Sequence, residues 1–324
     1  MSKRVNLFFS ISCTERLSAL DHLRFFSHVT RRALLLFLAM SVIWGISYLF
    51  IRIAVSDLSP LVLVFARTGI GMLILLPIAV SRGELRGLTK SWLPLFAFAA
   101  VEIGIPWVLM SHAEQSISSS LAGLLVAAVP LVGVVIATAL GNREHLGLAS
   151  GSGFLLGVVG VAAIVGFDVK ALNLMALVEM AGVVVCYAVG PAILARYLSG
   201  LPSVGVIAAS LTACTIVYAP LAALQWPHSV PPLPVLASVV VLAVVCTAIG
   251  FLLFFALVAE IGPVRATVIT YVNPAVAAVL GVIVLHERFS AGMAVGFVLV
   301  VLGSILATRR RLTRSSDTKI TVHD

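Results

Sequence analysis

The sequence predicts an all-α polytopic membrane protein with ten transmembrane helices arranged as two inverted five-helix repeats. Composition, ten long apolar segments and an internal repeat carry this prediction. The 324 residues are 61% hydrophobic and 10% charged, and the mean hydropathy is +1.16. Soluble globular proteins are about 45–50% apolar and about 25% charged. The apolar segments are long and do not alternate with polar residues, so we interpret them as helices rather than as strands of a barrel.

Ten apolar segments emerge from a window of about 19 residues, and short connections rich in turn residues separate them. The first five-helix repeat spans residues 33–167 and the second spans 173–308. We expect residues 1–32 and 309–324 to be basic cytoplasmic tails. The predicted spans are 33–54, 60–80, 92–112, 117–139, 148–167, 173–195, 203–224, 234–257, 263–285 and 290–308.

The distribution of basic residues predicts the orientation. With ten spans and a cytoplasmic N-terminus, 17 of the 21 Lys and Arg residues lie on the inner side, as the positive-inside rule requires. Nine or eleven spans would place the basic C-terminal tail outside. We therefore predict a multi-pass protein of the cytoplasmic (inner) membrane with both termini in the cytoplasm. The net charge of +8 comes from basic residues in the tails and short loops, where they set the orientation of the protein in the membrane. We therefore expect no nucleic-acid partner. The outer side holds Arg52, Lys170 and Arg288, and Arg67 lies within a span.

The pattern E-x8-G-x6-G occurs twice, and a shift of 143 residues superposes the two copies. Each copy lies where two predicted spans meet. Each unit has five spans, an odd number, so the first unit ends on the opposite side of the membrane from where it began. The second unit therefore enters the membrane in the opposite direction. Inverted repeats of this kind are typical of secondary transporters. The matched pairs are Glu144 with Glu287, Gly153 with Gly296, Gly160 with Gly303, and Trp44 with Tyr187.

Three stretches resemble the drug/metabolite transporters of the EamA type: WGISYLFIRIAVSDLSPLVLVFAR (44–67), VVIATALGNREHLGLASGSGFLLGVVG (134–160) and VLGVIVLHERFSAGMAVGFVLVVLG (279–303). The resemblance covers residues 33–308. It implies ten helices, two repeats and movement of small metabolites, often by export. The second repeat departs from the first by having Tyr187 in place of Trp44 and Ser210 in place of Arg67.

The expected function is secondary active transport of small metabolites, amino acids or drugs by alternating access, in the direction of export and driven by a proton gradient or by exchange. A passive channel and a non-transport membrane scaffold stay open as alternatives.

A membrane-embedded lipid enzyme is disfavoured, because the sequence has no HExxH, no GxSxG and no histidine–carboxylate cluster within a predicted span. The sequence also has no Walker A motif, GxxxxGK[ST], so we do not expect this chain to use ATP to drive transport. We predict no catalytic residue, no cofactor and no metal site, and the oligomeric state stays open. The expected partners are a small-molecule substrate, membrane lipid and, under the proton-coupled alternative, a proton.

Charged residues within spans are costly and are functional candidates by default. Arg67 is predicted roughly 10 Å, and Glu102 roughly 15 Å, below the outer surface at 1.5 Å per residue. Two interpretations remain open: Glu102 pairs with Arg67, or Glu102 lines the substrate cavity and exchanges a proton. Two interpretations also remain open for Glu179: its side chain faces the interior of the bundle, or it contacts water near the outer surface.

Other predicted roles rest on aromatic, polar, proline and glycine positions. Trp44 and Tyr187 are candidate cavity walls, and Tyr271 and Asn273 are candidate polar groups facing the cavity. Glu144 and Glu287 are expected to cap the helices that follow them or to form gate ion pairs. We expect His112 and Glu114 to lie in a solvated turn. Helix kinks are predicted at Pro130, Pro274 and Pro191, and close helix packing is predicted at Gly153, Gly160, Gly296 and Gly303.

Overall fold

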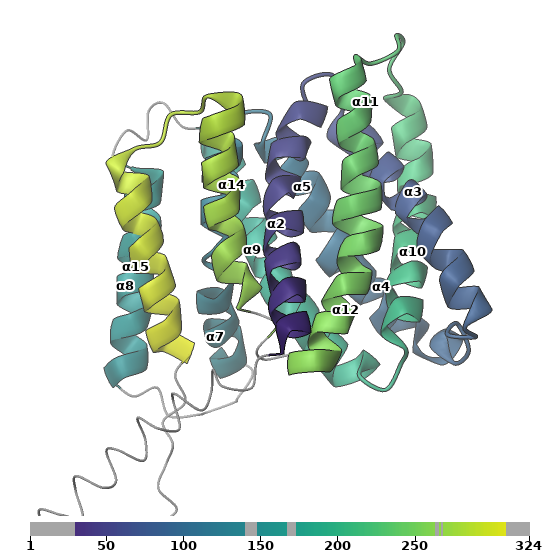
Figure 1. The fold of residues 1–324 in the computed structure, drawn as a ribbon, viewed down its shortest axis with the longest axis horizontal. Coiled ribbons are helices and arrows are strands. Elements are labelled where there is room, and N and C mark those ends of the chain that lie inside the picture. The colour runs from purple at the N-terminus through teal and green to yellow at the C-terminus, as the bar shows by residue number, and fades with distance from the viewer. Residues whose placement is uncertain (1–29, 140–147, 167–172, 263–265, 267, 309–324) are drawn as a thin grey trace, which may run out of the picture.

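The computed structural model describes residues 30–139, 148–166, 173–262, 266 and 268–308. All regular structure in these residues is helical, and the helices lie side by side in one bundle (Figure 1). The elements are α2 (Arg31–Ala54), α3 (Pro60–Ser81), η1 (Leu88–Ser91), α4 (Trp92–Phe98), η2 (Ala99–Gly104), α5 (Ile105–Ala113), α6 (Ser119–Val126), α7 (Val129–Ala139), α8 (Leu148–Val165), α9 (Leu174–Ile193), η4 (Leu194–Leu198), α10 (Ser203–Leu224), α11 (Leu233–Val240), η5 (Val241–Ile249), α12 (Gly250–Ile261), α14 (Ile269–Leu285) and α15 (Ala291–Thr308).

Eight described helical segments are long and apolar enough to cross a membrane. Two shorter apolar helices, Gly151–Val165 and Ile269–Leu285, lie where the fifth and ninth spans are predicted. The surface of the bundle carries large exposed aliphatic side chains, including Leu73, Leu155 and Ile283. In a bilayer such side chains face lipid tails, and the helices satisfy their own backbone hydrogen bonds. The chain is therefore a multi-pass membrane protein.

Helix starts follow from capping chemistry. Ser59 accepts a hydrogen bond from the backbone N–H of Val62, and Pro60 begins α3, where its missing N–H is not needed. Ser118 accepts from Leu121 at the start of α6. Asn173 accepts from Met175 at the start of α9. These side chains satisfy donors that the first turn of a helix leaves free.

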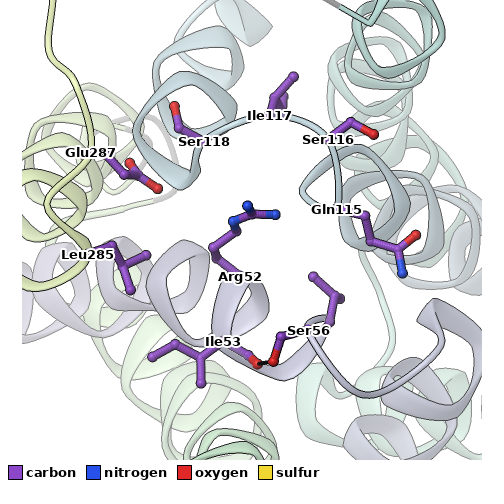
Figure 2. Close-up of a pocket in the computed structure, with 10 residues that line it drawn as sticks. Arg52, Ile53, Ser56, Gln115, Ser116, Ile117, Ser118, Leu285 and Glu287 are labelled. Carbon is purple, nitrogen blue, oxygen red and sulfur yellow. Dashed lines mark hydrogen bonds between the residues drawn. The ribbon is translucent and has the colours of Figure 1, made fainter.

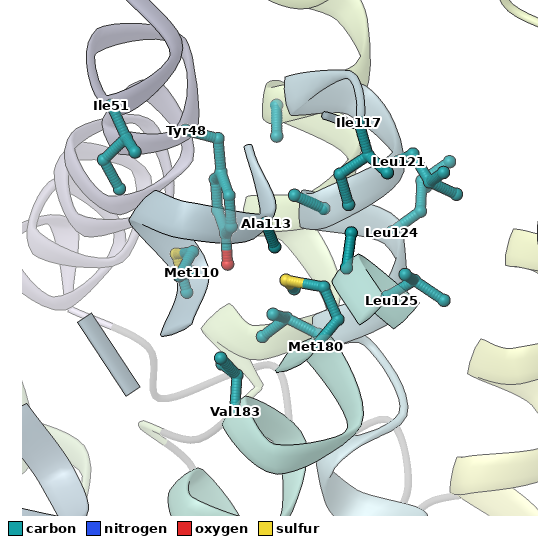
Figure 3. Packing of buried hydrophobic residues seen from close by; sticks show 14 of the residues in the cluster. Tyr48, Ile51, Met110, Ala113, Ile117, Leu121, Leu124, Leu125, Met180 and Val183 are labelled. Carbon is teal, nitrogen blue, oxygen red and sulfur yellow. The ribbon is translucent and has the colours of Figure 1, made fainter. Parts of the chain in front are cut away.

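The largest buried cluster lies where α2, α5, α6 and α9 meet (Figure 3). Tyr48, Met110, Leu124, Met180 and Val183 pack together there, and Figure 3 shows the Tyr48 ring among them. A second cluster joins α3, α10 and the segment from η1 to α5. Together they place a buried centre between α2, α3, α5, α9 and η5.

Two π-helical segments occupy matching places in the two halves of the chain. At the shift of 143 residues, η2 (Ala99–Gly104) corresponds to 242–247, which lie within η5 (Val241–Ile249). A π-helical turn inserts an extra residue into an α-helix and is frequent at functional sites. Pro106, the second residue of α5, contributes in the first half because it has no N–H to continue the α-helical ladder.

The three predicted kink prolines lie in different local settings. The fourth predicted span is interrupted for two residues, 127–128, and α7 begins directly after this interruption. Pro130 is the second residue of α7. Pro191 lies inside α9, three residues before the π-helical η4. Pro274 is buried inside α14. Their part in a transport cycle stays a proposal.

α8 and α15 pair along one edge of the bundle, while α3 and α10 pair at the other (Figure 1). The α8–α15 contact is made by backbone at the four predicted glycines. A Cβ on Gly153 would lie 2.8 Å from the carbonyl oxygen of Gly303, and one on Gly160 would lie 2.8 Å from that of Gly296. Only glycine allows this approach. Because the order of contacts reverses, the two helices are antiparallel.

Candidate functional site

Arg67 is buried at the centre of the bundle, and three elements hold it. It projects from α3 and is 7% exposed. Its guanidinium carbon lies 3.6 Å from the ring centroid of Trp107 on α5, so the cation stacks on the indole face. Its Nε donates to Oγ1 of Thr247 on η5 at 2.9 Å. Among the described residues Thr247 is its one hydrogen-bond partner, which leaves the terminal nitrogens for a ligand or water.

Thr247 is fixed by its own bond. Its hydroxyl donates to the backbone carbonyl of Leu242, five residues earlier, at 2.9 Å. This is the spacing of a π-helical turn, so the distortion of η5 supplies both the hydroxyl and its orientation. The oxygen is then free to accept from Arg67. Neither repeat alone builds this contact, because Arg67 lies in the first half and Thr247 in the second.

Two tyrosines border the guanidinium. The Tyr187 hydroxyl lies within electrostatic range of both Glu102 and Arg67 and beside Trp107. The Tyr48 hydroxyl lies near Arg67 and Tyr187. The centre therefore presents one cation among aromatic rings and hydroxyl groups. Such a mixture can orient a small molecule by its charge and by its flat or apolar part.

Glu102 lies on η2 and packs against α9 at Gly190. A Cβ on Gly190 would overlap the Glu102 carboxylate, so the glycine makes room for it. The buried Oε2 of Glu102 has no hydrogen-bond partner among the residues that the structure describes. No ion pair joins Glu102 to Arg67, which stacks on Trp107 instead, so the interpretation that pairs them is wrong. The depth argument placed the two residues at similar levels but did not include their rotation around their helices.

Glu179 is paired with a histidine. Its Oε1 lies 2.7 Å from Nδ1 of His112, which is in the last turn of α5. Glu179 is buried, whereas the His112 side chain is about half exposed. Glu179 therefore links α9 to α5 beside the central cluster, and its other oxygen has no hydrogen-bond partner in the described ranges.

Three further candidates lie away from Arg67. Trp44 packs on Phe254 of α12, with ring centroids 4.9 Å apart. The Tyr271 hydroxyl lies by Ser304 and Thr308 of α15. With its amide nitrogen turned toward α2, Asn273 donates to the carbonyl oxygens of Ser41 at 3.2 Å and Ile269 at 3.0 Å. The described contacts of these residues hold helices together.

An open cavity of about 670 Å³ lies at the end of the bundle where α2, α5 and α14 end and α6 begins. Figure 2 shows the Arg52 side chain extending into it between Gln115 and Glu287. Arg52 donates to the backbone carbonyl of Glu114. The residues that line the cavity are Arg52, Ile53, Val55, Ser56, Gln115, Ser116, Ile117, Ser118, Leu285 and Glu287.

Glu287 caps a helix of the other half of the chain. Its Oε1 accepts from the backbone N and Oγ of Ser119 at 2.8 and 2.9 Å, and its Oε2 accepts from the backbone N of Ser120 at 2.9 Å and from the Ser120 hydroxyl. The N-terminus of α6 favours this negative charge. Glu287 therefore caps α6 rather than the helix that follows it, so the expectation that it caps its following helix is wrong, and no gate ion pair of Glu287 occurs among the described residues. Glu144 lies outside the described residues.

Sequence reasoning missed several residues of this region. Thr247 carried no visible signal, because a threonine in an apolar span is common. Glu114 was expected in a solvated turn and is instead fully buried. The run Ser118-Ser119-Ser120 before an apolar segment was a usable signal, since it predicts a helix N-terminus rich in donors for an anion.

These features define a class: a polytopic helical membrane protein with a buried cationic centre and a cavity at one end of the bundle. The sequence model of the EamA-like transporter family matches residues 31–166 and again 174–309. The chain belongs to this family and is a membrane transporter.

Two individual comparisons agree with that assignment. The chain is 26% identical over 282 residues to the Uncharacterized transporter YvbV of Bacillus subtilis (strain 168), covering 84% of this chain and 90% of that protein. A crystal structure described only as that of a protein matches with a TM-score of 0.62 and 21% identity. It covers 85% of this chain and 96% of the other, and it supports the fold alone.

Proposed function

We propose that the protein is a secondary active transporter that exports small metabolites, amino acids or drugs across the cytoplasmic membrane by alternating access. The proposal includes ten membrane spans, an inverted relation between the two halves, and cytoplasmic termini. The observation that carries it is the buried guanidinium of Arg67, held by residues of both halves and with hydrogen-bonding capacity left over. An intramembrane charge of this kind is expensive and marks a functional site by default.

The glycine contacts between α8 and α15 support the inverted relation. Gly153 and Gly296 are repeat equivalents, as are Gly160 and Gly303, yet contact joins Gly153 to Gly303 and Gly160 to Gly296. An exchanged pairing of equivalent positions is what a twofold axis produces. An axis in the membrane plane relates two halves of opposite direction, and such halves can exchange inward-open and outward-open forms.

The central cluster favours cargo with an anionic group. The Arg67 fork can bind a carboxylate or phosphate with two parallel hydrogen bonds, and the rings of Trp107 and Tyr187 offer flat surfaces. Glu102 lies near Tyr187 on the side toward α9. We propose that its carboxylate binds an amino group of the cargo or a coupling proton.

The test is a proteoliposome screen of labelled amino acids, metabolites and drugs with an imposed pH gradient. Saturable flux with counterflow identifies a carrier, whereas linear flux without counterflow identifies a channel. We expect Glu102→Gln to lower gradient-driven flux at least about tenfold, equivalent to about 1.4 kcal/mol, because the amide cannot exchange a proton.

The matched control is Glu84→Gln, at a carboxylate outside the centre. Glu84 accepts a hydrogen bond from the backbone N of Gly205 at 3.1 Å, and an amide oxygen can do the same. This variant should keep its flux. Full gradient-driven flux in Glu102→Gln would remove Glu102 from coupling.

A further inference from the structure

Glu114 has surroundings unlike those of the other carboxylates at the cavity end of the bundle. It follows the last residue of α5, beneath the cavity that Gln115 and Arg52 line. It is 0% exposed, and within the described part of the chain neither of its carboxylate oxygens has a hydrogen-bond partner. A buried ion in this condition is very costly. The end of a helix also presents partial negative charge, which adds to that cost.

The charged and titratable groups that act on Glu114 come from three elements, while α9, which also packs on α5, carries Glu179 in its pair with His112. Arg52 and Tyr48 lie on α2, Arg67 on α3, and Glu287 on the segment after α14. Burial first, and then the negative charge of Glu287, hold the pKa of Glu114 well above its ordinary value of 4.5. Arg52 and Arg67 oppose that shift and do not overcome it.

The two glutamates differ in what they accept. Glu287 receives four hydrogen bonds from Ser119 and Ser120. Glu114 receives none, although Arg52 is close by. The guanidinium instead donates to the backbone carbonyl of Glu114. The burial of Glu114 without a donor thus favours its neutral form.

We propose that Glu114 is a proton-binding site reached from the cavity at the outer end of the bundle, and that its protonation state controls how open that end is. With the proton bound, the end of α5 stays buried as observed. When the proton leaves to water in the cavity, the carboxylate draws the Arg52 guanidinium from the backbone carbonyl, and the end of α5 becomes hydrated. The placement of this end outside rests on the proposed function; the switch itself does not require an identified cargo.

The test measures the pH dependence of thiol accessibility in reconstituted protein whose four native cysteines are replaced. Ile117 lines the cavity and is 4% exposed, whereas neighbouring Gln115 is exposed. The readout is the labelling rate of Ile117→Cys by an impermeant maleimide, divided by that of Gln115→Cys. The ratio removes the pH effect that the two thiols share, and the same ratio in Glu114→Gln controls for the effect of burial on the pKa of the thiol at position 117.

We expect the ratio to rise at least about threefold from about pH 5.5 to about pH 8.5, reporting a shift in population. Adding Glu114→Gln should keep it low at both pH values, because the amide mimics the protonated acid. Arg52→Gln should also flatten the response, because the ionised carboxylate loses its partner, and it provides a second test if the first variant fails to fold. Glu84→Gln, at a carboxylate that accepts from the backbone N of Gly205 outside the centre, should leave the response intact.

A ratio that does not change with pH in the parent, or that changes equally in Glu114→Gln or Arg52→Gln, overturns the proposal. Flux in the cargo screen is measured separately. A flat ratio together with saturable counterflow would reject the Glu114 switch and leave the transporter mechanism standing. A pH-dependent labelling ratio without any flux would support the Glu114 switch and count against the proposed transport function.

Discussion

Replacing Arg67 with glutamine should abolish high-affinity transport while leaving a folded protein. The guanidinium is the buried cation at the centre, and truncating one member of a buried charged hydrogen-bonded contact costs about 2–5 kcal/mol, which is about 30-fold or more in affinity. We expect the KM for an anionic cargo to rise by at least that factor. Arg67→Lys should recover only part of the loss, because an ammonium keeps the charge but not the planar fork.

Arg196→Gln is the matched control for this substitution. Arg196 also contacts an aromatic ring, 5.6 Å from the centroid of Tyr197, but it lies at the surface near the other end of the bundle. Its removal should leave KM within about twofold, since exposed cation–π contacts contribute about 0.5–1 kcal/mol to local structure. An Arg67→Gln protein with unchanged KM would show that the cargo binds elsewhere.

Adding one methyl group at Gly153 should destabilise the protein by about 1–3 kcal/mol. A Cβ there would lie 2.5 Å from the backbone nitrogen of Ala307 and 2.8 Å from the carbonyl oxygen of Gly303. Backbone atoms cannot rotate away as a side chain can, so α8 and α15 must separate. The measurement is the thermal unfolding midpoint of Gly153→Ala in detergent.

Gly151→Ala on the same helix gives the control. A Cβ at Gly151 meets nothing within 4 Å, and alanine is a better helix former than glycine by about 0.8–1 kcal/mol. That midpoint should stay the same or rise. Equal midpoints for the two variants would contradict the glycine-mediated contact and, with it, the symmetry argument for inverted halves.

Hydropathy alone located the helices well, because the requirement for long apolar segments acts locally on the sequence. The predicted span 203–224 coincides with α10, Ser203–Leu224. Breaks within spans were only partly visible. The interruption before Pro130 follows from proline chemistry. The π-helical η5 contains no proline, so nothing in its sequence indicates the distortion that brings the Thr247 hydroxyl to the Leu242 carbonyl.

The partners of polar residues were much harder to predict. Arg67 and Glu102 were placed at similar depths, but hydropathy does not report which way a side chain points around its helix. The π-helical turn at η2 changes that direction further. Likewise, Glu287 has donors nearer in sequence than Ser119. Only the packing of α14 beside α6 brings the two together.

The most direct test of the account is the sidedness of the two loops that carry the repeated glutamates. Single cysteines at Arg143 and Arg288 in a cysteine-free background are labelled with an impermeant maleimide in intact cells, before and after permeabilisation. The account predicts that Arg288→Cys reacts from outside and that Arg143→Cys reacts only after permeabilisation. Labelling of both from the same side would contradict the inverted repeat and the transport mechanism built on it.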